Sequence, residues 1–197
     1  MFCLSKINFL LLPPNFWEEH TVDYLKQFVI PFRGLGVGNH SFEFRIDEKF
    51  FEAIEYSELK NGNVNLKLEL TKEERMLVFE FHFEGTVEVT CDRCLDDFDF
   101  PVNGNEQLIV KFGEDWEEES DAIVIIPESE HQFDLSQYIY EYINLLLPMQ
   151  RIHPDNDKGK STCNAEMLAR LGSTSEKKED HDPRWDVLLK LKDENKN

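Results

Sequence analysis

The feature that most constrains the fold of this chain is a series of apolar residues at every second position. A period of two places these side chains on one face of a β-strand and the intervening polar side chains on the other. The pattern follows the turn signal Asn61-Gly62-Asn63 and predicts antiparallel strands with one face on the core and one face in water. The alternating residues are Val64, Leu66, Leu68, Leu70, Leu77, Phe79, Phe81 and Phe83.

Further runs extend the predicted sheet in both directions. Alternation at 28–32 and at 42–46 predicts two strands on either side of a glycine-rich loop. We expect Gly85 to mark a break or bulge in a strand, because a glycine has no side chain to pack. We expect the segment 103–105, Asn-Gly-Asn, to turn the chain. The continuous apolar run at 122–126 predicts one more strand, buried on both faces.

One segment has the period of a helix instead. Apolar residues recur at 135, 138, 139, 142, 143 and 146, after Asp134-Leu135-Ser136-Gln137, which has the form of a capping box. This pattern predicts a helix over 135–147 that packs on the sheet and ends before Pro148. A second, short helix is predicted from Asp182-Pro183, with Trp185, Leu188 and Leu189 on its apolar face.

These elements together predict an α+β fold. We expect a mostly antiparallel sheet that curls towards a barrel, with the amphipathic helix packed on it and C-terminal helical segments closing it. Residues 1–22 are predicted to be a disordered extension, 23–171 the α+β domain, and 172–197 a flexible linker with the short helix. The apolar run in the first segment is too short for a signal peptide, and no run approaches the roughly 20 residues that span a bilayer. We therefore expect a cytoplasmic protein with no membrane partner.

Two cysteines, Cys91 and Cys94, lie where one alternating run ends and the next begins. At the bend of a hairpin their sulfurs point to one spot, which is half of a tetrahedral metal site and also the minimum geometry for a disulfide. His153 and Cys163 follow the predicted helix and complete a set of three Cys and one His, the ligand number of structural zinc. We predict zinc as the cofactor of these four residues. The alternative is a surface histidine and unrelated thiols.

The same pair of thiols suggests a second function, that of a thiol oxidoreductase. Against this function, Asp92, Asp96 and Asp97 are expected to raise the pKa of a neighbouring thiol, and no helix N-terminus follows to stabilise a thiolate. Nucleophilic catalysis by a cysteine with a histidine is a further alternative, but the chain supplies no recognisable oxyanion loop or third group. We therefore expect no catalytic residue.

The charge of the chain indicates its partners. Lys and Arg number 21 against 40 Asp and Glu, which gives a formal net charge of −19. Such a surface repels phosphate backbones, so binding to naked RNA is disfavoured and basic proteins are the more natural partners. Six carboxylates crowd the segment 114–121, which we expect to be an exposed loop that can steer a basic protein. The alternative is that this charge only aids solubility.

The segment Val89-Thr90-Cys91-Asp92-Arg93-Cys94-Leu95 resembles the bacterial YceD family. The resemblance extends to the end of the predicted helix, Leu145-Leu146-Leu147-Pro148, to His153 and Cys163, and to the element that opens with Asp182-Pro183-Arg184-Trp185, so it covers 28–191. It implies a non-enzymatic ribosome-biogenesis factor that supports accumulation of large-subunit (23S) ribosomal RNA. The implied partners are a large-subunit precursor or basic ribosomal proteins. A zinc-stabilised interaction domain unrelated to ribosomes remains an alternative.

Overall fold

The computed structural model describes residues 24–156 and 158–174 of the 197-residue chain. The predictions for residues 1–22 and for the helix that opens at Asp182-Pro183 lie outside these residues. The chain divides into two compact units. The first consists of Met1–Thr90 and Asp97–Arg151, and the second of Cys91–Asp96 and Ile152–Asn197, each with its described residues only.

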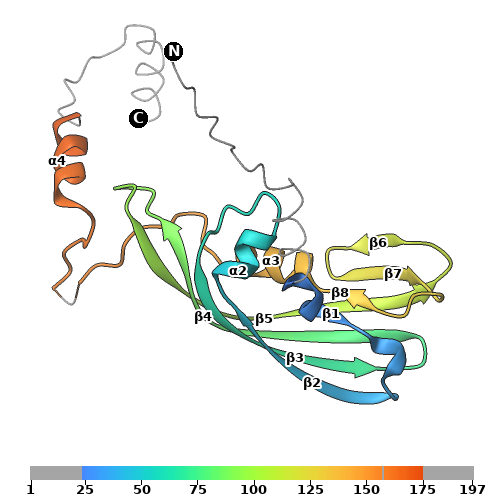
Figure 1. Cartoon of the computed structure of the whole chain (residues 1–197). Helices are drawn as coiled ribbons and strands as arrows, with labels where there is room; N and C mark the ends of the chain where they lie inside the picture. The colour runs from blue at the N-terminus through green and yellow to red at the C-terminus, as the bar shows by residue number, and fades with distance from the viewer. Residues whose placement is uncertain (1–23, 157, 175–197) are drawn as a thin grey trace, which may run out of the picture. The chain divides into compact units, whose positions relative to one another are not determined.

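A six-stranded sheet in the order β2-β3-β4-β5-β7-β6 forms the first unit (Figure 1). The first four of these strands follow one another in sequence and pair antiparallel, which confirms the prediction from the period of two. β7 pairs in parallel with β5 and antiparallel with β6, which was not predicted. The strands are β2 (Gly38–Ile46), β3 (Gly62–Lys72), β4 (Met76–Thr90), β5 (Asp97–Gly113), β6 (Glu117–Ser120) and β7 (Ile123–Pro127).

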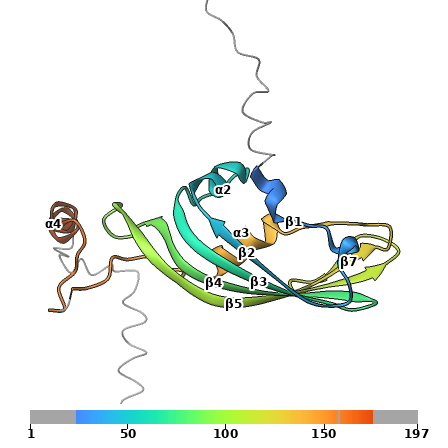
Figure 2. The same cartoon turned by 60° about the horizontal axis from the view of Figure 1, so that its bottom comes forward.

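Helical turns and a second, two-stranded sheet lie on the concave face of this sheet (Figure 2). The two strands, β1 and β8, pair antiparallel. Only two residues of the predicted strand at 28–32 are extended, because 3₁₀ turns flank them. These elements are η1 (Lys26–Phe28), β1 (Val29–Ile30), η2 (Phe32–Gly34), α2 (Glu48–Ala53), β8 (Phe133–Asp134) and α3 (Ser136–Leu145).

Helix α3 confirms the predicted amphipathic helix, although its start differs from a capping box. Leu135 is the N-cap residue, and the Asp134 carboxylate accepts a hydrogen bond from the Ser136 N–H at 2.8 Å. The Gln137 side chain does not reach back, because it donates to Glu141 one turn later. The buried apolar residues of α3, together with its N-cap residue, all belong to the predicted apolar stripe; they are Leu135, Ile139, Tyr142 and Ile143.

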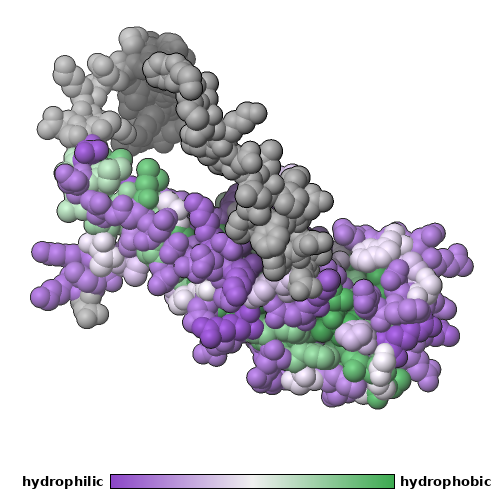
Figure 3. Space-filling view, viewed as in Figure 1, coloured by the Kyte–Doolittle hydropathy of each residue, from purple (hydrophilic) through white to green (hydrophobic). Residues whose placement is uncertain are grey.

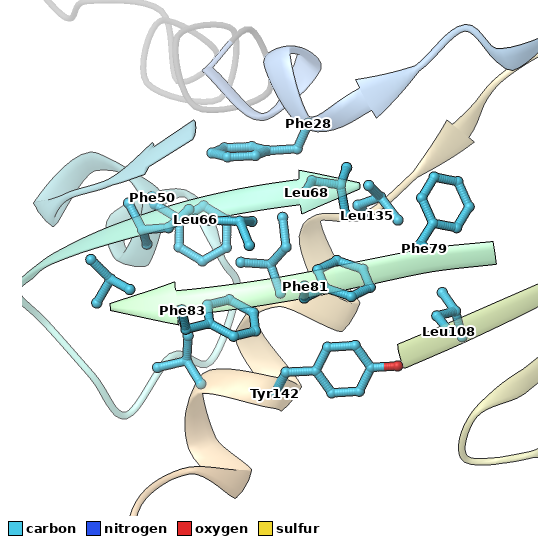
Figure 4. Packing of buried hydrophobic residues seen from close by; sticks show 14 of the residues in the cluster. Phe28, Phe50, Leu66, Leu68, Phe79, Phe81, Phe83, Leu108, Leu135 and Tyr142 are labelled. Atoms are coloured by element: carbon cyan, nitrogen blue, oxygen red, sulfur yellow. The ribbon is translucent and has the colours of Figure 1, made fainter. Parts of the chain in front are cut away.

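The core lies between α3, α2 and the concave face of the sheet. All eight alternating residues from Val64 to Phe83 are at most 2% exposed, as predicted. Figure 4 shows Phe81 beside Tyr142 of α3. Their ring centroids are 5.1 Å apart and the two rings pack edge-to-face. Phe28 packs edge-on against Phe50, with ring centroids 5.0 Å apart. On the face of the molecule drawn in Figure 3, hydrophilic side chains predominate over the strands, as the charge of the chain requires.

The sheet is not closed as a barrel, so this part of the fold prediction is wrong. Among the described strands, β2 and β6 are the two edges and do not pair with each other. The apolar side chains on the concave face are covered by helices and by the small β1–β8 sheet. Burial of that face therefore does not require the edge strands to meet.

The glycines at positions 85 and 104 do not interrupt the sheet. β4 runs continuously through Gly85 and β5 through 103–105, so the predicted bulge and turn are wrong. Gly85 lies opposite Val64, where an added Cβ would be 2.2 Å from the carbonyl oxygen of Asn63. At Gly104 an added Cβ would be 2.2 Å from a methyl group of Leu146. Both glycines provide space for a close neighbour rather than a change of direction.

Two predictions near the end of the sheet are corrected in part. The acidic segment 114–121 is exposed throughout, but residues Glu117–Ser120 form edge strand β6 rather than a loop. β7 is not buried on both faces, since only Val124 and Ile126 are fully buried and their neighbours are half-buried.

The described residues contain no helix long and apolar enough to cross a membrane.

Candidate metal centre

The first arm of the site is the turn Cys91–Asp96, which connects β4 to β5. The backbone closes it twice, because Cys91 N–H donates to Asp96 C=O and Leu95 N–H donates to Cys91 C=O, both at 2.9 Å. Leu95 has a φ of 64°, in the left-handed region that few residues other than glycine adopt. This conformation reverses the chain directly after Cys94 and fixes the two cysteines of the motif in a tight turn.

The second arm is the segment that carries His153 and Cys163. The Thr162 hydroxyl donates to the Pro154 carbonyl at 2.7 Å, which folds the segment back on itself. Ser161 Oγ accepts a hydrogen bond from the Cys163 N–H at 3.2 Å. These bonds place His153 and Cys163 close together although ten positions separate them.

A helix that the sequence did not predict, α4 (Ala165–Thr174), follows the second arm. Asn164 is the link between this helix and the first arm. Its side-chain oxygen accepts from the Glu166 N–H at 3.0 Å, as in a helix cap, and its amide donates to the Asp96 carboxylate at 3.0 Å. One side chain thus starts α4 and ties it to the cysteine turn. An Asn directly after the fourth ligand is the signal that could have predicted this helix start.

The structure brings together all four predicted ligands. Their Sγ and ring nitrogen atoms lie within 4.8 Å of one another. The Sγ atoms of Cys91 and Cys163 are 3.8 Å apart, and Cys94 Sγ is 3.4 Å from His153 Nδ1. Zn–S bonds of about 2.3 Å and a Zn–N bond of about 2.0 Å at tetrahedral angles require edges of about 3.8 and 3.5 Å. The donor set is therefore compatible with zinc in both chemistry and spacing.

The cluster is shielded from solvent and its thiols are free. Cys91, Cys94 and Cys163 are buried, at most 7% exposed, and His153 is half-buried. Four protein donors fill a tetrahedral shell completely and leave no position for a substrate or a water molecule. Such an arrangement suits a structural metal ion rather than a catalytic one.

The environments of Cys91 and Cys94 shift their pKa values in opposite directions. Burial disfavours the Cys91 thiolate, but hydrogen bonds from the backbone N–H groups of Cys94, His153 and Arg93, and from the His153 side chain, lower its pKa to about 6. Burial raises the pKa of Cys94, and the neighbouring sulfurs of Cys91 and Cys163 add to this rise.

The expectation that nearby carboxylates raise the pKa of a neighbouring thiol is thus wrong for Cys91. Asp92, Asp96 and Asp97 are not among the groups that shift its pKa, because the donors that dominate are backbone N–H groups of the turn itself. Residue types reveal charged side chains, but they do not reveal where backbone N–H groups point. A Cys-x-x-Cys turn that directs amides at its first sulfur stabilises a thiolate ligand.

A second group of possible ligands in the described chain is Glu69, Glu80 and His82, on β3 and β4. The sequence analysis did not identify it, because it depends on the register that sets Glu69 opposite Glu80. The ammonium group of Lys67 is 2.5 Å from Glu69 and already neutralises part of this charge. The side chains are partly or fully exposed, so this group lacks the shielding of the cysteine cluster.

The fold and the cluster define the class of protein: an α+β protein with a Cys₃His cluster that includes the turn between two antiparallel strands, β4 and β5, of a mixed sheet. A family model for the large ribosomal RNA subunit accumulation protein YceD matches residues 79–192. This range is more than half of the chain and contains all four cluster residues, so the chain belongs to the YceD family. The resemblance inferred from the sequence is confirmed, although the match begins at residue 79 rather than 28. Comparisons with curated proteins and with solved structures gave no match.

Proposed function

We propose that this protein is a non-enzymatic factor of ribosome biogenesis that supports accumulation of the large-subunit (23S) ribosomal RNA in the cytoplasm. The observation that carries the proposal is the match to the YceD family over residues 79–192. The family description ties its members to the large ribosomal RNA subunit and names no reaction. The closed, shielded donor set at Cys91 fits a structural role and offers no open position for catalysis.

The proposal includes one zinc ion held by Cys91, Cys94, His153 and Cys163. Three buried sulfurs and one imidazole nitrogen within 4.8 Å of one another support it. The ion would join the cysteine turn to the segment before α4, and would neutralise thiolate charge that burial otherwise disfavours. Its contribution is to hold these two segments in one arrangement.

The partners that we propose are basic ribosomal proteins or a large-subunit precursor that displays them. The net charge of −19 supports this choice, because it attracts cationic surfaces and repels bare RNA. We expect weak or absent binding to naked large-subunit RNA at physiological salt. Tight binding of the purified protein to protein-free RNA would contradict this mechanism.

A thiol oxidoreductase is the second candidate function, and one observation favours it. The pKa of Cys91 is lowered to about 6, which is typical of reactive thiols. However, Cys91 is 0% and Cys94 1% exposed, so an incoming disulfide cannot reach either sulfur without a conformational change. Elemental analysis of protein purified without chelator separates the two functions. About one zinc per chain, with Cys91 and Cys94 resistant to thiol reagents, supports the structural site; metal-free protein with reactive thiols supports the oxidoreductase.

The test of the proposed function uses a strain that lacks this protein. We expect sucrose-gradient profiles to show fewer large subunits relative to small subunits, and we expect normal profiles when the wild-type chain is supplied. A Cys163→Ser chain should restore them only in part, because it removes one ligand of the cluster. An unchanged subunit ratio in the deletion strain would contradict the ribosomal role. It would favour the alternative that the protein is an interaction domain unrelated to ribosomes.

A further inference from the structure

The first unit contains a groove between α3 and the β5–β7–β6 end of the sheet. Its volume is about 870 Å³, and its walls come from β5, β6, β7 and α3. Its lining combines aromatic and apolar side chains with carboxylates and amides. No part of the proposed zinc site contributes to it.

The charge of this groove is entirely of one sign. None of the described residues that line it is Lys, Arg or His. A groove lined by several carboxylates attracts cations and raises their local concentration near the aromatic rings that also line it. The carboxylates come from four different segments of the chain, which the fold brings together. They are Glu106, Glu118, Asp121, Asp134 and Glu141.

Aromatic rings and an exposed leucine line the same groove. Trp116 is 54% exposed and Leu145 71% exposed, and the half-buried Tyr138 and Tyr140 and the buried Tyr142 of α3 line the same groove. The exposed face of a Trp or Tyr ring attracts the guanidinium of Arg or the ammonium of Lys. The aliphatic stems of these residues also pack on apolar surface. Rings beside carboxylates thus suit long cationic side chains.

The acidic side of the groove is held in place rather than free to move as a loop. β6 pairs with β7, and the Glu119 carboxylate accepts from the Lys111 ammonium at 2.6 Å. The Trp116 ring stacks on Phe133 with centroids 6.1 Å apart. Because side chains alternate along β6, Glu118 lines the groove while Glu119 is engaged with Lys111. Binding therefore needs little ordering of these carboxylates.

Two tyrosines of the groove have raised pKa values, for which burial is the main cause and nearby carboxylates are a smaller one. Burial raises the pKa of Tyr138 to about 12, and the charges of Glu118 and Glu141 add to the rise. Burial also raises the pKa of Tyr142, followed by the charge of Glu106. Glu141 thus acts on both tyrosines, while Glu118 acts on Tyr138 and Glu106 on Tyr142, which places carboxylates of three elements near these two side chains.

We propose that this groove binds an extended Lys- and Arg-rich segment of a basic protein. The proposal rests on the proposed function, since it assigns a surface to the basic partner inferred there. Alternating cationic side chains would pair with the carboxylates that line the groove, and one of them would lie over the exposed Trp116 ring. Gln107, Gln137 and Asn144 also line the groove. Each amide already donates one hydrogen bond within the protein, to Glu80, Glu141 and the Tyr140 carbonyl respectively, so an extended segment would use the second N–H and the oxygen of each amide.

The test measures binding of a short fluorescein-labelled peptide that alternates Arg with Ser, by fluorescence anisotropy with the full chain. Glu118→Gln with Glu141→Gln removes two charges from the groove. The matched control, Glu117→Gln with Glu84→Gln, removes two exposed charges that do not line it. We expect the groove variant to bind the peptide about fivefold more weakly than the control variant at about 0.15 M salt. Circular dichroism verifies that both variants are folded.

A separate variant tests the contribution of the Trp116 ring to peptide binding. Trp116→Leu keeps an apolar side chain but removes the ring face, and it should weaken binding of the Arg peptide more than binding of a Lys peptide. Equal losses in the groove and control variants would show attraction by net charge alone and would overturn the proposal. Displacement of the peptide by spermidine at concentrations below the peptide's dissociation constant would assign the groove to a polyamine, which also overturns it.

Failure of this proposal is distinguishable from failure of the proposed function. If the peptide does not bind, yet the groove variant restores the subunit ratio of the deletion strain, the groove assignment is wrong and the ribosomal role stands. If the deletion strain has a normal subunit ratio, the ribosomal role is wrong, and peptide binding that depends on Glu118 and Glu141 still establishes a basic-segment site.

Discussion

Gly85→Ala should destabilise the protein strongly, although it adds a single methyl group to a strand. The Cβ at this position would lie 2.2 Å from the Asn63 carbonyl oxygen and 2.6 Å from Val64 Cα, where ordinary contacts are 3.4–4 Å. Both obstacles are backbone atoms of β3, so relief requires β3 and β4 to separate by roughly 1 Å. Gly85 has no positive φ, so lack of space and not backbone conformation is the cause.

The expected size follows from three contributions. Overpacking costs about 1–3 kcal/mol, and each weakened ladder hydrogen bond costs about 1 kcal/mol. Alanine restricts the unfolded chain more than glycine does, which offsets about 0.5 kcal/mol. We expect the free energy of unfolding to fall by about 2–3 kcal/mol. This loss is large against the roughly 5–15 kcal/mol of a typical domain.

The matched variant is Gly104→Ala. Its added Cβ would be 2.2 Å from a methyl group of Leu146, the flexible end of a half-buried side chain that can rotate away. We expect a loss below about 1 kcal/mol. Urea denaturation of zinc-saturated protein, followed by circular dichroism, measures both values. Equal stability losses for the two variants, or a Gly85→Ala protein as stable as wild type, would refute the reasoning from backbone contact.

Three further predictions concern other parts of the molecule. Burial and the hydrogen bond to Asp47 raise the pKa of Tyr24 to about 12. Because the unfolded chain loses this proton from about pH 10 upward, the free energy of unfolding should fall as the pH rises from about 10 to 12. Absorbance of the phenolate at alkaline pH should show that Tyr24 titrates late. Asp47→Ala should lower the free energy of unfolding by about 1–2 kcal/mol, because Asp47 also caps α2 by accepting a hydrogen bond from the Lys49 N–H. Asp47→Asn should lower the free energy of unfolding by less in the same urea assay. Removal of zinc by a chelator should change amide NMR signals of 91–96 and of the described residues after 152, while those of β3 retain their positions.

Much of the first unit could be predicted because local pattern and burial agree there. The strands from Val64 to Phe83 and helix α3 each have one apolar face, and that face is the one the structure buries. The cluster could also be predicted, because cysteine and histidine are few in the chain and their chemistry is specific. Whether the cluster binds zinc stays a prediction.

Other features depended on contacts that no local pattern contains. Gly104 has the sequence neighbours of a turn residue, but the strand continues through it in the ladder with β4, and the missing side chain leaves space for Leu146, which is far along the chain. The parallel pairing of β5 with β7 and the edge strand in the acidic segment depend on register between strands. The low pKa of Cys91 depends on the direction of backbone N–H groups, which residue types do not specify.

The order of strands in the sheet has a consequence for folding kinetics. β2, β3, β4 and β5 pair with their immediate sequence neighbours, so each pairing closes only a short loop and can form early. The ligand atoms instead meet across separations of 59 and 72 residues. Cys91 and Cys94 are therefore expected to be without their other two ligands when β4 and β5 have already paired. In refolding from denaturant, uptake of zinc by the proposed site, followed with a metal-sensitive dye, should lag behind the circular dichroism signal of the strands, and the free thiols can be oxidised during that interval.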